Sequence, residues 1–323
     1  MGISDMALAI GIDVGGTAIK GGIVSSSGKV LEKRSLTTEA ESGLDHVLDR
    51  LGGMIQSLAQ LARSMDGGLK GVGLGVPGIV RHADGVVLAA PNLSGWEGAP
   101  VAARVRAAAG LPVVVENDAN AAALAENHCG AGVGAQSLVL LTLGTGIGSG
   151  LVLGGRLWRG TADGAGELGH MIVEIAGRPC TCGQRGCLET YAWAYATARR
   201  ARELIEKGEG SWLKQALDRG DRITSELVAE GVQRGDPVAT RVWEESSRYL
   251  AMACINIQRT LAPERIVIAG GMSAAGDLLL DPIVRAVKHL NSTQLAPAPT
   301  LKIAALGNDA GFIGAALSAL RDG

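Results

Sequence analysis

Residues 7–24 read ALAIGIDVGGTAIKGGIV, two apolar stretches separated by the turn Gly15-Gly16-Thr17. Apolar residues on both sides of the glycines predict a strand, a tight turn and a second strand, and we expect a third strand at Val30–Ser35. Residues 137–153, SLVLLTLGTGIGSGLVL, repeat this arrangement around Gly144-Thr145-Gly146. We interpret the repeat as an internal duplication, which predicts two lobes that face each other across a cleft.

The composition agrees with a two-lobed α/β protein. The chain has 323 residues, enough for two cores, and it is 47% hydrophobic with only 3% aromatic residues. The cores must therefore be filled by small aliphatic side chains, which suits buried strands that alternate with helices.

The charge and the apolar stretches exclude several classes of protein. Lys and Arg total 30 against 32 Asp and Glu, a net charge of −2 without long runs of one sign, so we expect neither a nucleic-acid nor a membrane partner. No basic residue precedes an apolar stretch in Met1–Ala7, which predicts a cytosolic protein rather than a secreted one. Ser137–Gly155 lacks charge, but its glycines and polar residues favour two buried strands over a membrane span.

Apolar spacing predicts the remaining elements. Helices are expected at Leu44–Ala62, Val101–Ala108, Ala119–Glu126, Glu189–Glu206, Val238–Leu261 and Asp309–Leu320, and strands at Val72–Val76, Val113–Glu116 and Arg265–Ala269. We expect the lobe boundary between Glu116 and the glycine-rich residues 130–134 and place it after Asp118. Residues 1–118 with 309–323 would then form a small lobe, and residues 119–308 a larger one.

The two glycine turns suggest a site for the phosphates of a nucleotide. Glycine lets a backbone approach a phosphate closely with its N–H groups, and an acid at a strand end can hold a hydrated magnesium ion. Neither turn has the G-x-G-x-x-G or Walker spacing, so Rossmann and P-loop sites are excluded, whereas two plain hairpins remain the alternative. The residues assigned to the nucleotide are Asp13, Gly15, Gly16, Thr17, Lys20, Gly144, Thr145, Gly146 and, more weakly, Gly270 and Gly271.

The segment Glu116-Asn117-Asp118-Ala119-Asn120 stands between an expected strand and an alanine-rich helix. A carboxylate there can accept the proton of an attacking hydroxyl, as phosphoryl transfer to an alcohol requires. The alternative is structural, because Asn or Asp before such a helix is also the expected N-cap. Both interpretations hold if Asn117 or the backbone caps the helix while Asp118 points outward.

Three of the five cysteines fall within eight residues and are spaced by glycines. Together with one histidine they form a Cys3His set suited to tetrahedral zinc: His170, Cys180, Cys182 and Cys187. Such a zinc has no open position, so it would be structural. Glu167 and Glu189 bracket the ligands and can accept hydrogen bonds from sugar hydroxyls, and His170 could bind zinc with one ring nitrogen and sugar with the other. An odd number of cysteines argues against a disulfide framework.

A few residues are less informative. Trp96 looks exposed in the loop at residues 91–96, where Asn92 either contacts a ligand or is a turn asparagine under a packed Trp96. Cys129 and Cys254 are expected in the core. The remaining histidines, for which no partner is expected, are His46, His82, His128 and His289.

Taken together, these motifs resemble the ROK family of sugar kinases and sugar-responsive repressors over almost the whole chain. The motifs that carry the resemblance are residues 13–17, 116–120, 144–148, 167–170 and 180–189. The last of them, with its cysteine spacing and final glutamate, is the most specific.

The resemblance implies the actin-like, ribonuclease-H-like ATPase fold, with two lobes, a duplicated βββαβα core, a central cleft and a C-terminal helix packed on the first lobe. It also implies ATP and magnesium at Asp13 and the glycine turns, structural zinc, Asp118 as general base, and a homodimer or homotetramer. The sugar ligands that it implies are Asn117, Asp118, Glu167, His170 and Glu189.

Residues 116–126 and 167–170 look like those of the family's glucokinases, so we favour ATP-dependent phosphorylation of glucose at O6. N-acetylmannosamine, fructose and allose kinases are the alternatives, because contacts around C2 from the loops at Gly78 and Asn92 would decide the sugar. Family repressors carry a helix-turn-helix domain ahead of Asp13, where only twelve residues stand here, so we expect no DNA-reading domain. A non-catalytic sugar sensor would not need both phosphate turns, and an acetate kinase or chaperone ATPase would not need the Cys3His set.

Overall fold

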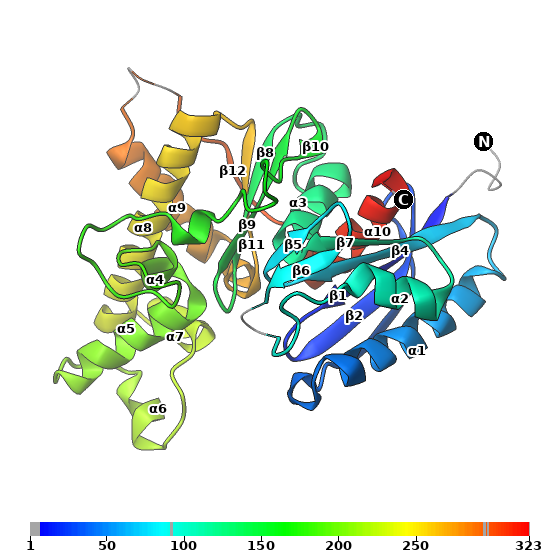
Figure 1. The fold of residues 1–323 in the computed structure, drawn as a ribbon. Helices are drawn as coiled ribbons and strands as arrows, with labels where there is room; N and C mark the ends of the chain where they lie inside the picture. The colour runs from blue at the N-terminus through cyan, green and yellow to red at the C-terminus, as the bar shows by residue number, and fades with distance from the viewer. Residues whose placement is uncertain (1–6, 91–92, 293–294, 296, 323) are drawn as a thin grey trace. The chain divides into compact units, whose positions relative to one another are not determined.

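The computed structural model describes residues 7–90, 93–292, 295 and 297–322 (Figure 1). The chain forms two compact units. Unit 1 contains residues 1–136, 150–166 and 305–323, and unit 2 contains residues 137–149 and 167–304. The predicted lobe boundary after Asp118 falls inside unit 1, because the helix that follows it packs against the C-terminal helix of the same unit.

Unit 1 is built on a five-stranded sheet with the order β3-β2-β1-β4-β7. The strands are β1 (Leu8–Val14), β2 (Ala18–Ser25), β3 (Val30–Thr37), β4 (Leu69–Val76) and β7 (Val113–Asn117), while β5 (Ile79–Arg81) and β6 (Val86–Ala89) form a separate hairpin. β1 pairs antiparallel with β2 and parallel with β4. The predicted strand, turn and strand at residues 7–24 are confirmed.

Helices cover both faces of this sheet (Figure 1). They are α1 (Leu44–Ala62), α2 (Val101–Ala109), α3 (Asp118–Cys129) and α10 (Ala310–Asp322), with the short η2 (Ala40–Ser42) and η5 (Gly307–Asp309). Neighbouring residues of β2 point to opposite faces: a Cβ at Gly21 would meet Met54 of α1, and one at Gly22 would meet Phe312 of α10. The C-terminal helix therefore packs on the first unit, as expected.

Glycines in the sheet bring α10 unusually close to the strands. A Cβ at Gly11 would lie 1.8 Å from the carbonyl oxygen of Phe312, and one at Gly73 would lie 1.7 Å from that of Ala315. Any larger residue would push the helix away from β1 and β4. This close approach places the N-terminal turn of α10 beside the end of β1, where Asp13 lies.

A second five-stranded sheet has the order β10-β9-β8-β11-β12. Its strands are β8 (Leu138–Leu143), β9 (Ile147–Leu153), β10 (Arg156–Leu157), β11 (Arg265–Ala269) and β12 (Leu301–Ile303). Counted from the first strand of each sheet, both orders read third, second, first, fourth, fifth. The predicted duplication is confirmed, and the uncharged Ser137–Gly155 stretch forms two strands rather than a membrane span. No helix in the described part of the chain is long and apolar enough to cross a membrane.

Unit 2 holds most of the helices. They are α4 (Glu189–Ala192), α5 (Ala194–Glu206), α6 (Lys214–Asp218), α7 (Ser225–Gln233), α8 (Pro237–Leu261) and α9 (Asp277–Leu290), with η3 (Leu168–His170) and η4 (Gly271–Ala275). The single helix predicted at Glu189–Glu206 is wrong, because Trp193 adopts an extended backbone and separates α4 from α5.

Three further predictions about single residues need correction. Trp96 is 1% exposed, packed in the core of unit 1, so it is not a surface residue. Cys254 is fully buried as expected, whereas Cys129 is only half-buried at the end of α3. Three of the four histidines have partners: His46 contacts Glu39, His128 contacts the carbonyl of Ser26, and His82 lies in a charged cluster described below.

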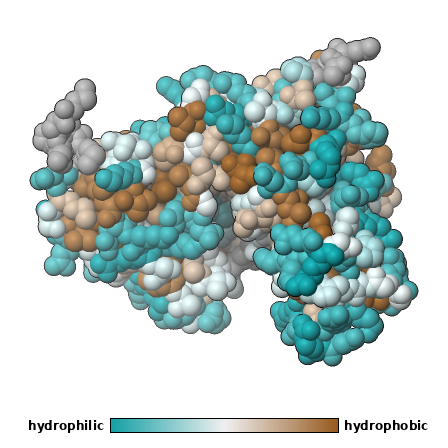
Figure 2. Space-filling model, turned by 180° about the vertical axis from the view of Figure 1, so that it is seen from behind, coloured by the Kyte–Doolittle hydropathy of each residue, from teal (hydrophilic) through white to brown (hydrophobic). Residues whose placement is uncertain are grey.

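On the face drawn in Figure 2, apolar residues reach the surface between hydrophilic ones. Large side chains exposed by more than half include Ile175, Tyr195, Ile172 and Trp158.

Candidate active site

The first glycine turn joins β1 to β2. The N–H of Gly15 donates to the carbonyl of Ala18 over 3.0 Å, and the Thr38 hydroxyl donates to the carbonyl of Gly15 over 2.6 Å. Gly16 and Thr17 are exposed, and among the described residues no hydrogen bond occupies their backbone N–H groups. The turn is thus fixed at its base, and its two exposed residues offer backbone N–H donors, as a phosphate site needs.

Asp13 ends β1 beside the N-terminal turn of α10. A Cβ at Gly311 would lie 2.7 Å from its Oδ2, so glycine is required where the helix meets the carboxylate. Lys20 is the cross-strand neighbour of Asp13. Burial raises the pKa of the Asp13 carboxyl to about 6, although the positive charge of Lys20 lowers it. A bound divalent cation would offset this cost of burying a charge, so Asp13 fits the magnesium site expected from the sequence.

An Asp13→Asn variant is expected to be more stable than the unsubstituted protein at pH 7.5. A folded-state pKa raised from 3.8 to about 6 means that stability is lost as the pH rises through this window. The loss at neutral pH is at most about 3 kcal/mol, and an amide does not suffer it. Urea unfolding at pH 7.5 and pH 5.0 should show a gain for Asp13→Asn that is larger at pH 7.5.

The exposed Asp49 of α1 supplies the control, since Asp49→Asn should leave stability unchanged at both pH values. An Asp13→Asn variant with no gain in stability, or with the same gain at both pH values, would contradict the conclusion that burial raises the pKa of Asp13.

The junction between β7 and α3 holds the predicted base. Asn117 is the N-cap of α3, because its Oδ1 accepts from the N–H of Asn120 over 3.0 Å. Its Nδ2 donates to the carbonyl of Gly78 over 2.9 Å. Asp118 is the first residue of α3 and is half-buried, with Oδ1 2.8 Å from the N–H of Ala119. Capping by Asn117 therefore fulfils the condition under which Asp118 can serve as a base.

Gly78 contributes a carbonyl that orients Asn117, and its predicted contact with sugar stays a prediction. Asn92, the other residue expected near C2 of the sugar, lies outside the described residues.

Sequence reasoning missed the partners of Glu116, which directly precedes Asn117. This carboxylate is buried, and Arg159 donates to its Oε2 from Nε over 2.7 Å. The two residues are 43 positions apart. The one signal in the sequence was Glu116 itself, because a buried carboxylate needs a cationic partner.

In unit 2 the second glycine turn lies against the predicted sugar-binding segment. A Cβ at Gly146 would lie 3.2 Å from Oε2 of Glu189, and one at Gly169 would lie 2.1 Å from the carbonyl oxygen of Ile147. The N–H of Leu168 also donates to the Ser149 hydroxyl over 3.1 Å. The structure thus ties residues 167–170 to the strand that follows the turn.

The four predicted zinc ligands come together. One ligand atom from each of His170, Cys180, Cys182 and Cys187 lies within 4.8 Å of all the others. The sulfurs of Cys182 and Cys187 are 3.7 Å apart, and His170 Nδ1 is 3.6 Å from the Cys180 sulfur. Zinc–sulfur bonds of about 2.3 Å in a tetrahedron place two sulfurs about 3.8 Å apart. The set therefore fits zinc.

The contacts of the two glutamates agree with their expected place beside the zinc set. Glu189, the first residue of α4, accepts from the Cys180 thiol over 3.0 Å and is 13% exposed. Glu167 is 52% exposed, with its Oε2 4.0 Å from Nε2 of His170. Since Nδ1 of His170 faces the thiols, Nε2 stays available on the side of Glu167. The orientation of the ring permits the predicted division between zinc and sugar, which stays a prediction.

Gly270 and Gly271 follow β11, where a Cβ at Gly270 would meet the backbone of Leu143 at 2.5 Å. Gly271 lines a cavity of about 230 Å³ together with residues of α7 and η4 and with Trp243 of α8. The cavity is partly apolar and lies inside unit 2. Its position at the strand end agrees with the weaker prediction that this glycine pair contacts an adenosine.

Comparison with known proteins gives consistent matches over most of the chain. A glucokinase of Halalkalibacterium halodurans is 37% identical over 306 residues, which cover 94% of this chain and 92% of that protein. A xylose repressor of Caldicellulosiruptor bescii is 30% identical and covers 86% of this chain and 69% of that protein. A ROK family glucokinase from Streptomyces griseus, solved in complex with glucose and AMPPNP, has a TM-score of 0.82 at 33% identity, covering 96% of this chain and 98% of that one.

The strand order of both sheets and the match to this solved structure confirm the expected actin-like ATPase fold. The model of the ROK family matches residues 9–322. The match includes every motif on which the resemblance was based, and the chain therefore belongs to the ROK family.

Proposed function

We propose that this protein is an ATP-dependent glucokinase, which transfers the γ-phosphoryl group of ATP to O6 of glucose. The similar proteins from Halalkalibacterium halodurans and Streptomyces griseus are both named glucokinase, and the latter was solved with glucose and an ATP analogue. The geometric observation that carries the proposal is that Asn117, and not Asp118, accepts the capping hydrogen bond of α3.

Asp118 acts as the general base. Its carboxylate accepts the proton of the sugar hydroxyl while that oxygen forms a bond to the γ-phosphorus, and the bond between the γ-phosphorus and the bridging oxygen of ADP breaks. Asn117, held by the carbonyl of Gly78, donates to a neighbouring sugar hydroxyl. Glu167 and Glu189 accept hydrogen bonds from hydroxyls of the same sugar, and His170 contributes Nε2.

The nucleotide is held by backbone donors and by Asp13. The exposed N–H groups of Gly16 and Thr17 bind phosphate oxygens, as do those around Thr145. Magnesium, when bound, neutralises phosphate charge, and Asp13 is the residue that would hold it through water. The cavity beside Gly271 receives the adenosine. His170, Cys180, Cys182 and Cys187 would hold the zinc, which when bound would keep the Cys3His loop folded and Glu189 in place.

A coupled assay of ADP release tests the function. It should be run with glucose, N-acetylmannosamine, N-acetylglucosamine, fructose, mannose and allose, and we expect the largest kcat/KM with glucose. A larger kcat/KM with N-acetylmannosamine, fructose or allose would leave the proposed mechanism unchanged but identify that sugar as the substrate. Sugar binding by calorimetry without turnover on any sugar would instead identify a non-catalytic sensor.

The family resemblance also leads us to expect a cytosolic homodimer or homotetramer. Light scattering coupled to gel filtration measures the number of subunits.

A further inference from the structure

Glu116 is a buried carboxylate at the end of β7, with 3% of its side chain exposed. Its Oε1 accepts from the N–H of Asn117 over 2.9 Å and from Nδ2 of Asn120 over 3.1 Å. These two partners stand on either side of Asp118. The position of the Glu116 carboxylate therefore fixes the backbone before Asp118 and the first turn of the helix after it.

Arg159 holds the other oxygen of this carboxylate. Its Nε and Nη2 lie 2.7 Å and 2.6 Å from Oε2 of Glu116, and its side chain is 19% exposed. A planar guanidinium that donates twice fixes both the direction and the distance of a carboxylate, which a flexible ammonium does not. Because a buried carboxylate without a partner is strongly destabilising, Glu116 depends on Arg159 for its place.

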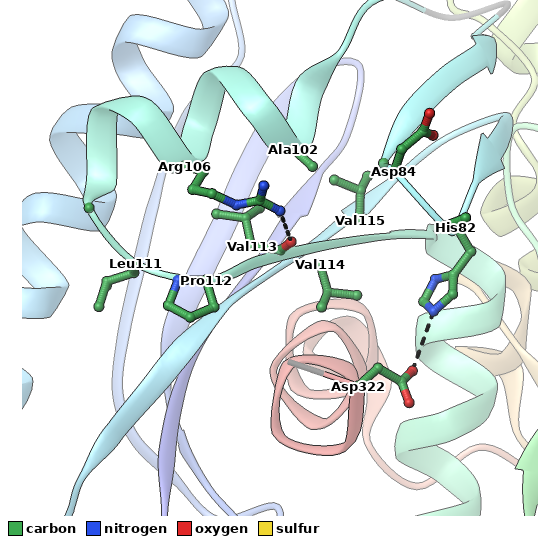
Figure 3. A pocket seen from close by; sticks show the side chains of 13 residues that line it. His82, Asp84, Ala102, Arg106, Leu111, Pro112, Val113, Val114, Val115 and Asp322 are labelled. Carbon is green, nitrogen blue, oxygen red and sulfur yellow. Dashed lines mark hydrogen bonds and ion pairs between the residues drawn. The ribbon is translucent and has the colours of Figure 1, made fainter.

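His82 and Asp322 lie beside Glu116 and Arg159, but neither of them takes the place of Arg159. His82 lies with Nδ1 3.7 Å from Oε2 of Glu116 and Nε2 3.5 Å from Oδ2 of Asp322. Figure 3 shows the His82 ring pointing toward Asp322 at the edge of a cavity of about 630 Å³. Nδ1 is buried and has no hydrogen-bond partner among the described residues. Arg159 therefore supplies the short hydrogen bonds to Glu116 Oε2, and it is also 3.5 Å from Asp322.

We propose that Arg159 is a positioning residue for phosphoryl transfer: through Glu116 it sets the geometry of the junction from which Asp118 reaches the sugar. The inference rests on the proposed kinase function. The side chain of Arg159 forms hydrogen bonds and ion pairs with Glu116 and Asp322, and it reaches the junction through Glu116. Its effect should therefore appear in the chemical step more than in binding.

The first test compares Arg159→Met with Arg159→Lys. We expect Arg159→Met to lower kcat by about 10- to 100-fold, the scale of a displacement by about 1 Å from a distant change. KM for glucose and for ATP should change less than about threefold, since the binding groups remain. Arg159→Lys keeps the charge but not the two-nitrogen contact and should recover part of kcat.

Arg156→Met is the matched control, because Arg156 is an exposed arginine on the same segment with no ion pair among the described residues. Its kcat should equal that of the unsubstituted enzyme.

The second test is the double variant Glu116→Gln, Arg159→Met. The glutamine keeps an oxygen for the two partners of Oε1 but carries no charge that needs Arg159. The double variant should therefore unfold at a higher temperature than Arg159→Met alone and have a kcat no lower than it, a non-additive result typical of residues that act through each other. Thermal unfolding of all variants separates loss of folded protein from loss of turnover.

Several outcomes would overturn the positioning role. They are a kcat of Arg159→Met equal to that of Arg156→Met, a rise in KM with unchanged kcat, or a double variant whose losses simply add. These results all presuppose that the unsubstituted enzyme phosphorylates a sugar and that Asp118→Asn does not. If the unsubstituted enzyme turns over no sugar, the proposed function itself fails, which is a distinct result.

Discussion

Replacing Asp118 by asparagine is expected to lower kcat by about 10²- to 10⁴-fold, because the amide cannot accept the proton of the attacking hydroxyl. Asparagine has nearly the same shape, and the cap of α3 comes from Asn117, so the helix should form as before. Calorimetry with glucose and with an ATP analogue should therefore give dissociation constants close to those of the unsubstituted enzyme. The measurement is kcat from the coupled assay together with these two constants.

Asp49→Asn serves as the control, since it removes an exposed carboxylate of the same unit far along the chain. It should leave kcat unchanged. An Asp118→Asn enzyme whose kcat stays within a few-fold of the original would remove Asp118 from the mechanism. A loss of sugar binding and thermal stability together would mean instead that Asp118 is needed to form the junction.

Removing one zinc ligand has the second large expected effect. A Cys182→Ser variant should contain less zinc, unfold at a lower temperature and bind glucose more weakly. Because Cys182 is exposed, the substitution disturbs little packing by itself, so a large loss must come from the metal. Without zinc the thiol of Cys180 and the ring of His170 lose their common partner, and Glu189, 3.0 Å from that thiol, loses its support.

Metal analysis by mass spectrometry, thermal unfolding and the KM for glucose check this prediction. We expect about one zinc per chain in the unsubstituted protein and a Cys182→Ser affinity for zinc that is about 10- to 100-fold lower. Cys129→Ser, which changes a thiol at the end of α3 and outside the Cys3His set, should keep zinc and KM unchanged. Fully active protein that contains no zinc would refute the structural role.

Some elements could be predicted from short stretches of sequence. The helix Leu44–Ala62 and the strand Arg265–Ala269 have the predicted bounds, because apolar periodicity and flanking turn residues are local signals. The helix expected at Glu189–Glu206 was wrong at one residue, Trp193, whose extended backbone no local signal announces. Trp96 was likewise expected at the surface, yet contacts from residues distant in the chain bury it.

The candidate site likewise contains features that the sequence could predict and features that it could not. The zinc set was predictable because glycines and cysteines within eight residues can reach one point without help from the rest of the chain. The surroundings of Asp118, the predicted base, were not predictable. Glu116 contacts Arg159 only after β7 and the segment that follows β10 have folded into one unit. The two residues are 43 positions apart, and no spacing in the sequence relates them.

The sequence by itself determined the duplicated strand-turn-strand units, the glycine turns, the Cys3His set and the family, because each depends on residue types at short, fixed spacing. The tertiary structure alone decided which residue caps α3, that burial raises the pKa of Asp13, and that an arginine and a glutamate fix the junction at Asp118. These depend on burial and on contacts between distant segments, and such contacts exist only once the chain has packed.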